Sequence, residues 1–147
     1  MHAHWPPMDD ETVEERVAAR LQRQELLKTQ TKSFNFLIEE HVLRRPIGSI
    51  DEQRRQLLHL LASGKPRHIA VQVVPDTGAH PGLNGPFVLL ETPEHDRLAY
   101  EEGQSMGLLS SEPDKVNQLC QRHEMILRKA LTPEASAEFI SKLAEEL

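Results

Sequence analysis

The sequence is poor in the residues that build disulfide-stabilised domains and membrane spans. Its 147 residues include a single cysteine, Cys120, which leaves no internal disulfide and no cysteine-based zinc site. Aromatic residues make up only 4% of the chain, and no apolar run approaches the roughly 20 residues of a membrane span. The N-terminal residues lack the basic and then apolar order of a signal peptide. These absences predict a cytoplasmic protein that does not enter a membrane.

Positive charge is also scarce. The chain has 17 Lys and Arg residues against 23 Asp and Glu residues, which gives a formal net charge of −6. Because a nucleic-acid interface needs a basic face to neutralise phosphates, this balance argues against direct DNA binding by the chain. The sequence contains no phosphate-binding loop, dinucleotide fingerprint, nucleophile elbow or HExxH motif. We therefore expect neither a cofactor nor a metal.

The chain does have helical periodicity at both ends and strand patterns between them. A chain of this length can bury one core, so we expect an N-terminal tail over residues 1–9 and a single effector-like or sensor-like domain over residues 10–147. Helices are predicted over Asp10–Lys28, after a capping box at Ser49–Glu52, from Pro113, and after Thr132-Pro133. Strands are predicted over Phe34–Glu40, His68–Val74, Pro86–Thr92 and Arg97–Glu102, with a possible short strand near Met106–Leu109.

These elements predict an α+β fold. The strands of the middle region are expected to form a small antiparallel sheet, packed with about four to five helices. Apolar residues at helical spacing are expected to face the core; they are Val13, Val17, Leu21, Ile50, Leu57, Leu58, Leu61, Phe139, Ile140, Leu143 and Leu147.

One connection concentrates the irregular backbone of the chain. The stretch VVPDTGAHPGLNGPFVLLE, Val73–Glu91, holds three of the seven glycines and three of the ten prolines. Gly78, Gly82 and Gly85 can take positive φ, and the prolines stiffen the chain, so we expect a loop of fixed shape. Such a loop is either a wide connection over a sheet edge or the wall of a binding site. His80 within it is either a hydrogen-bonding or exposed residue, or a ligand contact.

Strand alternation places two carboxylates in positions that need a partner. Glu40 shares its strand face with Phe36 and Ile38, and Glu102 shares its face with Leu98 and Tyr100. An unpaired buried carboxylate is too costly to keep, so each acid predicts either an ion pair or the rim of a pocket. Pairing with Arg44 or Arg45 is one interpretation. In the other, the catalytic candidates Glu40, Glu102, Tyr100 and His80 form a site that moves protons without a cofactor.

Several segments together resemble a known family. They are RVAARLQRQELL (Arg16–Leu27), EEHVLRRPIG (Glu39–Gly48), PDTGAHPGLNGPFVLLE, AYEEG with the later GLL, and ALTPEASAEFI (Ala130–Ile140). In order and spacing they resemble the domain of unknown function at the C-terminal end of actinobacterial Xre-type helix-turn-helix regulators, the antitoxin-like transcriptional regulator family.

This resemblance implies a domain that senses a small molecule or a small partner protein. Members usually carry an N-terminal helix-turn-helix that binds DNA, and no catalytic residues are established for them. The residues before Val13 are too few for a helix-turn-helix, so we do not carry DNA binding over to this chain. The expectation is either an excised effector domain or a freestanding copy.

Two functional hypotheses follow. In the first, the chain is a regulatory binding module whose cavity lies between the sheet, the Pro75–Pro86 loop and the two C-terminal helices. In the second, it is a cofactor-independent enzyme of cyclase or isomerase type in a specialised-metabolite pathway. Both hypotheses use the same ligand-binding residues: Glu40, His80, Pro81, Gly82, Phe87, Tyr100 and Glu102. The expected partners are a small-molecule ligand or a small partner protein, and the chain could also form a homodimer.

Overall fold

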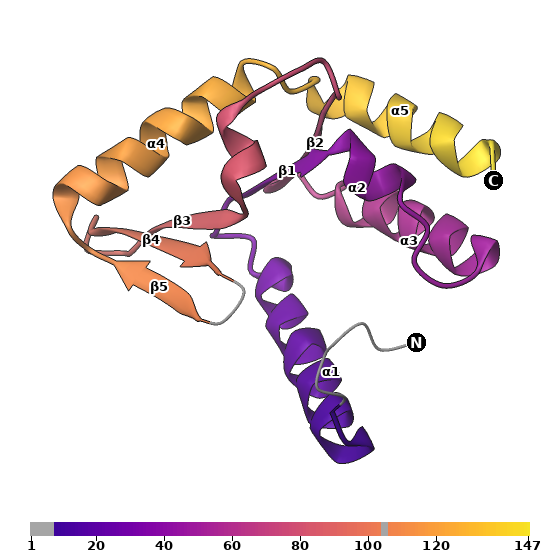
Figure 1. Cartoon of the computed structure of the whole chain (residues 1–147), viewed down its shortest axis with the longest axis horizontal. Helices are drawn as coiled ribbons and strands as arrows, with labels where there is room; N and C mark the ends of the chain where they lie inside the picture. The colour runs from indigo at the N-terminus through magenta and orange to yellow at the C-terminus, as the bar shows by residue number, and fades with distance from the viewer. Residues whose placement is uncertain (1–7, 104–105) are drawn as a thin grey trace.

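The computed structural model describes residues 8–103 and 106–147 of the chain. Most of the tail predicted over residues 1–9 therefore lies outside the described residues. The described part is an α+β structure with helices at both ends, as the sequence predicts (Figure 1). The elements in chain order are α1 (Asp10–Gln24), η1 (Glu25–Lys28), β1 (Phe34–Glu39), α2 (Glu40–Arg44), α3 (Ile50–Ser63), β2 (Ile69–Val74), η2 (Pro81–Asn84), β3 (Phe87–Glu91), β4 (Arg97–Glu102), β5 (Gly107–Ser110), α4 (Pro113–Leu127) and α5 (Pro133–Glu145).

The strands form two small sheets rather than one. β1 and β2 pair in parallel, with Phe34 opposite Ile69 and Glu39 opposite Val74. The prediction that the His68–Val74 strand joins an antiparallel sheet is therefore wrong. α3 lies between β1 and β2 in the chain, and a helical crossover of this kind is the ordinary connection between parallel strands. The antiparallel sheet consists of β3, β4 and β5 in that order.

The helix boundaries follow local sequence signals. Ser49 and Glu52 form the predicted capping box at the start of α3, and the Thr132 side chain caps the N-terminus of α5. The helices α2 and η2 are too short to show a helical pattern in the sequence. No helix of the described residues is long and apolar enough to cross a membrane.

Each sheet has its own cluster of buried side chains. The larger cluster packs β2 against α3 and α5, and its most buried members include Leu57, Val73 and Ile140. The smaller cluster packs Ala99 of β4 against Val116 and Leu119 of α4. Figure 1 shows the same arrangement, with α4 along one side of the three-stranded sheet and α5 beside α3.

The outer edge of β2 has no strand beside it among the described residues. Instead, the segment that leads into α5 supplies its hydrogen bonds. The Leu131 backbone N–H donates to the Val73 carbonyl oxygen at 2.8 Å, and the Val73 N–H donates to Ser136 Oγ at 2.9 Å. Ser136 is fully buried, so this edge of the small sheet is sealed by α5.

Some predicted core positions face solvent. α1 has no buried residue, and Val17 and Leu21 of its apolar stripe are at least half exposed. In α3, Leu57 is 2% exposed, but its neighbour Leu58 is 50% exposed and Ile50 is 60% exposed. The stripe of α3 that reaches the core is therefore narrower than predicted, because one helix face meets β2 and α5 while the next is open.

Candidate functional site

The loop between β2 and β3 lies at the carboxyl ends of the two parallel strands. β1 ends at Glu39 and β2 ends at Val74, so the chain leaves both strands at the same edge of the sheet. The loop is joined to the segment that follows the C-terminal end of α4, because Lys129 Nζ donates to the Ala79 carbonyl oxygen at 3.0 Å. The rigid loop that the sequence predicts is thus held over a strand end, a common location for ligands in sheets with parallel strands.

His80 is a partly buried residue of this loop, and its ring is the covered part. Its side chain is only 5% exposed. Nδ1 accepts a hydrogen bond from the Gly82 backbone N–H at 3.2 Å, so the proton of the neutral ring lies on Nε2. Nε2 faces Glu39 Oε1 at 3.6 Å, and the other oxygen of Glu39 lies 3.2 Å from His41 Nδ1. Both ring nitrogens of His80 therefore face protein groups.

Position 82 requires glycine because there is no room for a side chain, and not because the backbone has a positive φ. Gly78 and Gly85 have φ of +111° and +119°, but Gly82 is not among the residues with positive φ, so that part of the prediction is wrong. A Cβ atom at Gly82 would lie 2.9 Å from two atoms of the His80 ring and 3.0 Å from Glu39 Oε1. The absent side chain is what allows His80 and Glu39 to approach each other. Strand alternation points to Glu40 as the inward carboxylate, so the sequence does not predict the role of Glu39.

Glu40 does not end a strand but begins α2, and it already has two partners. Oε1 accepts a hydrogen bond from Arg44 Nε at 2.6 Å, and Oε2 accepts one from the Asp76 backbone N–H at 3.1 Å. The side-chain hydrogen bond from Arg44 and then the bond from the Asp76 backbone lower the pKa of Glu40. The predicted ion pair with Arg44 is confirmed, and Glu40 stabilises the start of the loop.

The other predicted residues lie on the three-stranded sheet, except Pro81, which begins η2. Pro81, Phe87 and Glu102 line a shallow hollow of about 270 Å³, together with Arg122 of α4. Tyr100 lies on the opposite face of that sheet, packed over Gly107. The structure therefore brings His80 and Gly82 together beside Glu39. It places Pro81, Phe87 and Glu102 in a separate hollow and leaves Tyr100 outside both groups.

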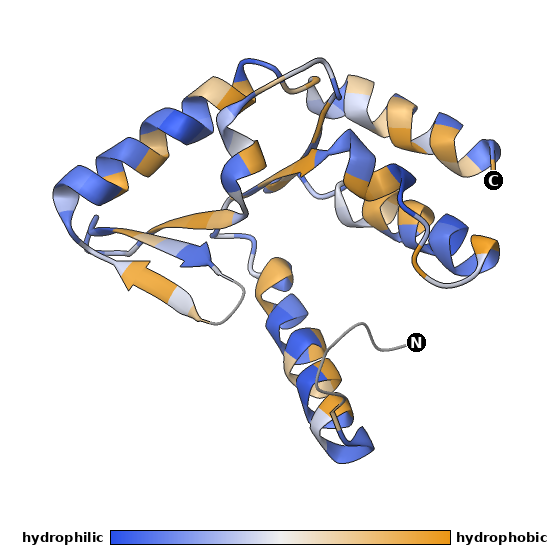
Figure 2. Ribbon diagram, in the orientation of Figure 1, coloured by the Kyte–Doolittle hydropathy of each residue, from blue (hydrophilic) through white to orange (hydrophobic). Residues whose placement is uncertain are grey.

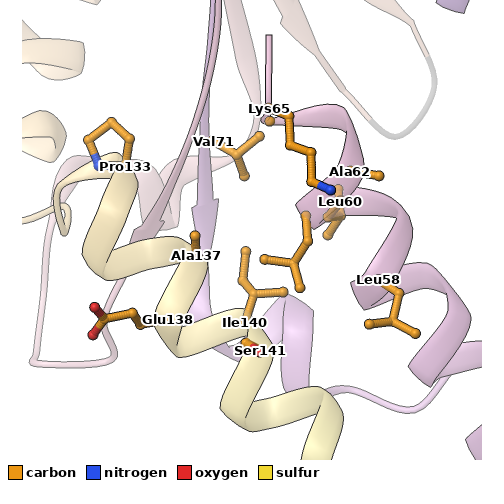
Figure 3. A pocket seen from close by; sticks show the side chains of 12 residues that line it. Leu58, Leu60, Ala62, Lys65, Val71, Pro133, Ala137, Glu138, Ile140 and Ser141 are labelled. Carbon is orange, nitrogen blue, oxygen red and sulfur yellow. The ribbon is translucent and has the colours of Figure 1, made fainter. Parts of the chain in front are cut away.

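A larger hollow lies elsewhere, between α3 and α5. This α3–α5 groove has a volume of about 590 Å³ and is mainly apolar. Figure 3 shows Leu58 and Leu60 on one side, Ala137 and Ile140 on the other, and Val71 of β2 at the back. The full lining is Leu58, Leu60, Leu61, Ala62, Gly64, Lys65, Val71, Pro133, Ala137, Glu138, Ile140 and Ser141.

Charged side chains at this groove are few and unequally placed. Lys65 follows the end of α3, and its ammonium group reaches over the groove toward Leu60 and Ala62 (Figure 3). The Glu138 carboxylate points away from α3 in the same view. Among the described residues Lys65 has no ion-pair partner. The groove thus combines apolar walls with one available cation, a composition suited to an apolar molecule that carries an acidic group.

Metal binding has no support in the part of the chain that the structure describes. No three His, Cys, Asp or Glu side chains in residues 8–103 and 106–147 lie close enough together to hold a metal ion. Cys120 is partly buried and packs against the smaller core cluster.

Comparison with known proteins identifies the family. The chain matches the family described as "Domain of unknown function (DUF5753)" over residues 1–142, and it therefore belongs to that family. Searches of curated proteins and of solved structures gave no significant match.

Proposed function

We propose that this DUF5753 domain is a binding module that holds a small molecule in the α3–α5 groove. The groove volume of about 590 Å³ carries the proposal, since pockets for small molecules typically have about 300–1,000 Å³. Burial of an apolar ligand body against Leu58, Pro133 and Ala137, which are exposed apolar residues of the lining, supplies the favourable free energy. The Lys65 ammonium group selects ligands with a carboxylate or another anionic group.

The regulatory part of the proposal rests on the sequence resemblance described above. A domain of Xre-type regulators of the antitoxin-like family would report its ligand to a DNA-binding partner rather than contact DNA itself. The net charge of −6 is compatible with a domain that does not contact DNA itself. We place the chain in the cytoplasm, as one part of a regulatory system that responds to a small anionic metabolite.

The structure favours binding over the alternative of a cofactor-free enzyme. A general base needs a nitrogen or oxygen atom that can reach the proton of a substrate. Both ring nitrogens of His80 face protein groups, and its side chain is almost completely covered. Glu40 is engaged with Arg44 and Asp76, and Tyr100 and Glu102 belong to the other sheet. The four candidate residues therefore do not share one reaction site.

The proposal can be tested by calorimetric titration with two probes of equal length and opposite charge, decanoate and decylamine. We expect decanoate to bind and decylamine to bind more weakly. Lys65→Gln should weaken decanoate binding about tenfold, the effect of losing roughly one charge-assisted hydrogen bond. Ala137→Phe, which places a ring between α3 and α5, should abolish it.

Lys32→Gln provides the matched control, since Lys32 is an exposed lysine that does not line the groove. It should leave the affinity for decanoate unchanged. Decanoate binding that survives both Lys65→Gln and Ala137→Phe would place the site elsewhere, and the absence of any decanoate binding would contradict the proposed ligand class.

A further inference from the structure

Within residues 8–103 and 106–147, the three-stranded sheet is covered on one side only. Its inner face packs against α4 through Phe87, Leu89 and Ala99. Its outer face consists of Val88, Leu90, Leu98, Tyr100 and Leu109. Val88, Leu90 and Leu109 of this outer sheet face are each more than half exposed. Figure 2 colours β5 and most of β3 as hydrophobic.

The sequence of β3 is that of a strand buried on both faces. Phe87, Val88, Leu89 and Leu90 form a continuous apolar run, whereas a strand with one solvated face would alternate with polar residues. Across the outer sheet face, Val88, Tyr100 and Leu109 are direct neighbours in register on the three strands. A contiguous apolar surface of this kind marks an interaction site.

α1 also has an apolar surface that is exposed. It is a 15-residue helix with no buried residue, yet Val13, Val17 and Leu21 form a stripe along one side of it. This α1 stripe is about 12 Å long at 1.5 Å per residue. The part of β4 from Leu98 to Glu102 is about 13 Å long at 3.3 Å per residue. In Figure 1, α1 projects away from the other helices, so that in one copy of the chain neither surface covers the other.

One edge of the α1 stripe is basic, although Glu14 lies at its other edge, and one end of the outer sheet face carries an acid. At 3.6 residues per turn, Arg16, Arg20 and Arg23 form a row along one edge of the α1 stripe. Glu102 is the last residue of β4, where it lies opposite Gly107; alternation puts it on the same face as Tyr100, and at this sheet end it also borders the hollow beside Pro81. Among the described residues, none of these four charged side chains forms an ion pair. A helix placed along β4 with its arginine row toward Glu102 would pair them.

From these observations we infer that two copies of the chain form a symmetric dimer in which α1 of each copy packs on the outer sheet face of the other. Two-fold symmetry makes the contact reciprocal, so each copy contributes both a helix and a sheet surface. Two such contacts per dimer bury twice the area of one, and stable interfaces bury roughly 800 Å² per partner. The inference is independent of ligand binding in the α3–α5 groove.

Sedimentation velocity over a concentration series tests this dimer. The unaltered chain should sediment as a dimer. The helix variant Val17→Glu/Leu21→Glu and the sheet variant Leu90→Lys should each raise the dissociation constant by roughly 30-fold or more, as expected for residues at the centre of an interface. Gln22→Glu, on the side of α1 opposite the stripe, is the control and should leave the dimer intact. All the substituted residues are exposed, and circular dichroism should show unchanged folding.

Mixing the two variants distinguishes reciprocal packing from other dimers. One helix–sheet contact in a mixed dimer keeps both unaltered surfaces, so the mixture should associate more strongly than either variant alone. A monomeric unaltered chain would overturn the inference. So would a dimer that is lost in the helix variant but kept in the sheet variant, which would indicate pairing of α1 with α1. Failure of the mixture to associate would also overturn it.

Discussion

At the scale of single residues, Gly82 is the position where the loop depends most on the absence of a side chain. His80 and Glu39 occupy the space where a Cβ atom of residue 82 would lie. The backbone N–H of Gly82 also donates to His80 Nδ1, so the same residue positions the ring and leaves room for it. The contact of His80 and Gly82 with Glu39 joins the loop to the end of β1, which is a structural role.

Gly82→Ala should therefore destabilise the chain by roughly 1–3 kcal/mol, the usual cost of overpacking. In a His80→Ala background the ring is gone, and the same substitution should cost less, with a coupling of about 1 kcal/mol between the two positions. Chemical denaturation of the four proteins of this cycle gives the values. Equal costs in both backgrounds would show that the His80 ring does not occupy this space.

Glu40 makes stability depend on pH. Arg44 and the Asp76 backbone lower the pKa of Glu40 in the folded state, so it contributes stability above the unfolded pKa of about 4.3, which is lost as the pH falls through the lower folded value. Glu40→Gln should reduce the free energy of unfolding by about 1 kcal/mol at pH 7, with a difference that shrinks toward pH 3.

Urea denaturation of the two proteins across this pH range provides the measurement. Glu15→Gln is the control, because Glu15 lies on exposed α1 and has no ion-pair partner among the described residues. A Glu40→Gln deficit that stays constant from pH 7 to pH 3 would show that the carboxylate charge is not the stabilising feature.

At the scale of elements, α3 places one of two adjacent leucines in the core and the other in the α3–α5 groove. Leu57 is 2% exposed and belongs to the larger core cluster, while Leu58 is 50% exposed and lines the α3–α5 groove. One helix thus contributes its inner face to stability and its neighbouring face to the proposed binding site.

Leu57→Ala should destabilise the chain by roughly 2–5 kcal/mol, because burial is lost and a cavity remains. Leu58→Ala removes the same atoms from a half-exposed position and should cost much less. Thermal and urea unfolding of the two variants make a matched comparison. Similar losses at both positions would mean that the buried face of α3 has been assigned incorrectly.

The sequence predicts elements well where the signal is local. The capping box at Ser49 and the Thr132-Pro133 start locate two helices, and the pair of Glu40 with Arg44 spans only four residues. The parallel pairing of β1 with β2 depends on how α3 crosses between them, which no local pattern specifies. Leu58 has the same apolar character as Leu57, and only the position of α5 makes one exposed and the other buried.

The candidate site shows the same limit. The unusual composition of the loop points to His80 and Gly82, and the structure brings them together. The α3–α5 groove was not predicted, since its walls come from α3, β2 and α5, and each lining residue has an ordinary role in its own element. Lys65 lies two residues after the end of α3, and a lysine near a helix end is too common to indicate a ligand site.

At the scale of the whole molecule, the described residues form two sheets with separate core clusters, and no other described element covers the α3–α5 groove or the outer sheet face. The larger cluster supports the α3–α5 groove, and the smaller one supports the outer sheet face. The assignment of residues 10–147 to a single domain stays a prediction. The proposed ligand and the proposed second copy use different surfaces, so binding and dimerisation can be measured separately.

The most direct measurement of the central claim is a ¹H–¹⁵N NMR titration of the chain with decanoate. We predict that the largest shift changes occur at backbone amides of Ala62, Lys65, Ala137 and Ser141, which line the α3–α5 groove. The amide of Gly82 should shift little, since its N–H is already bound to His80. Shift changes centred on Gly82, with the groove residues unaffected, would contradict the account and place the ligand at the loop.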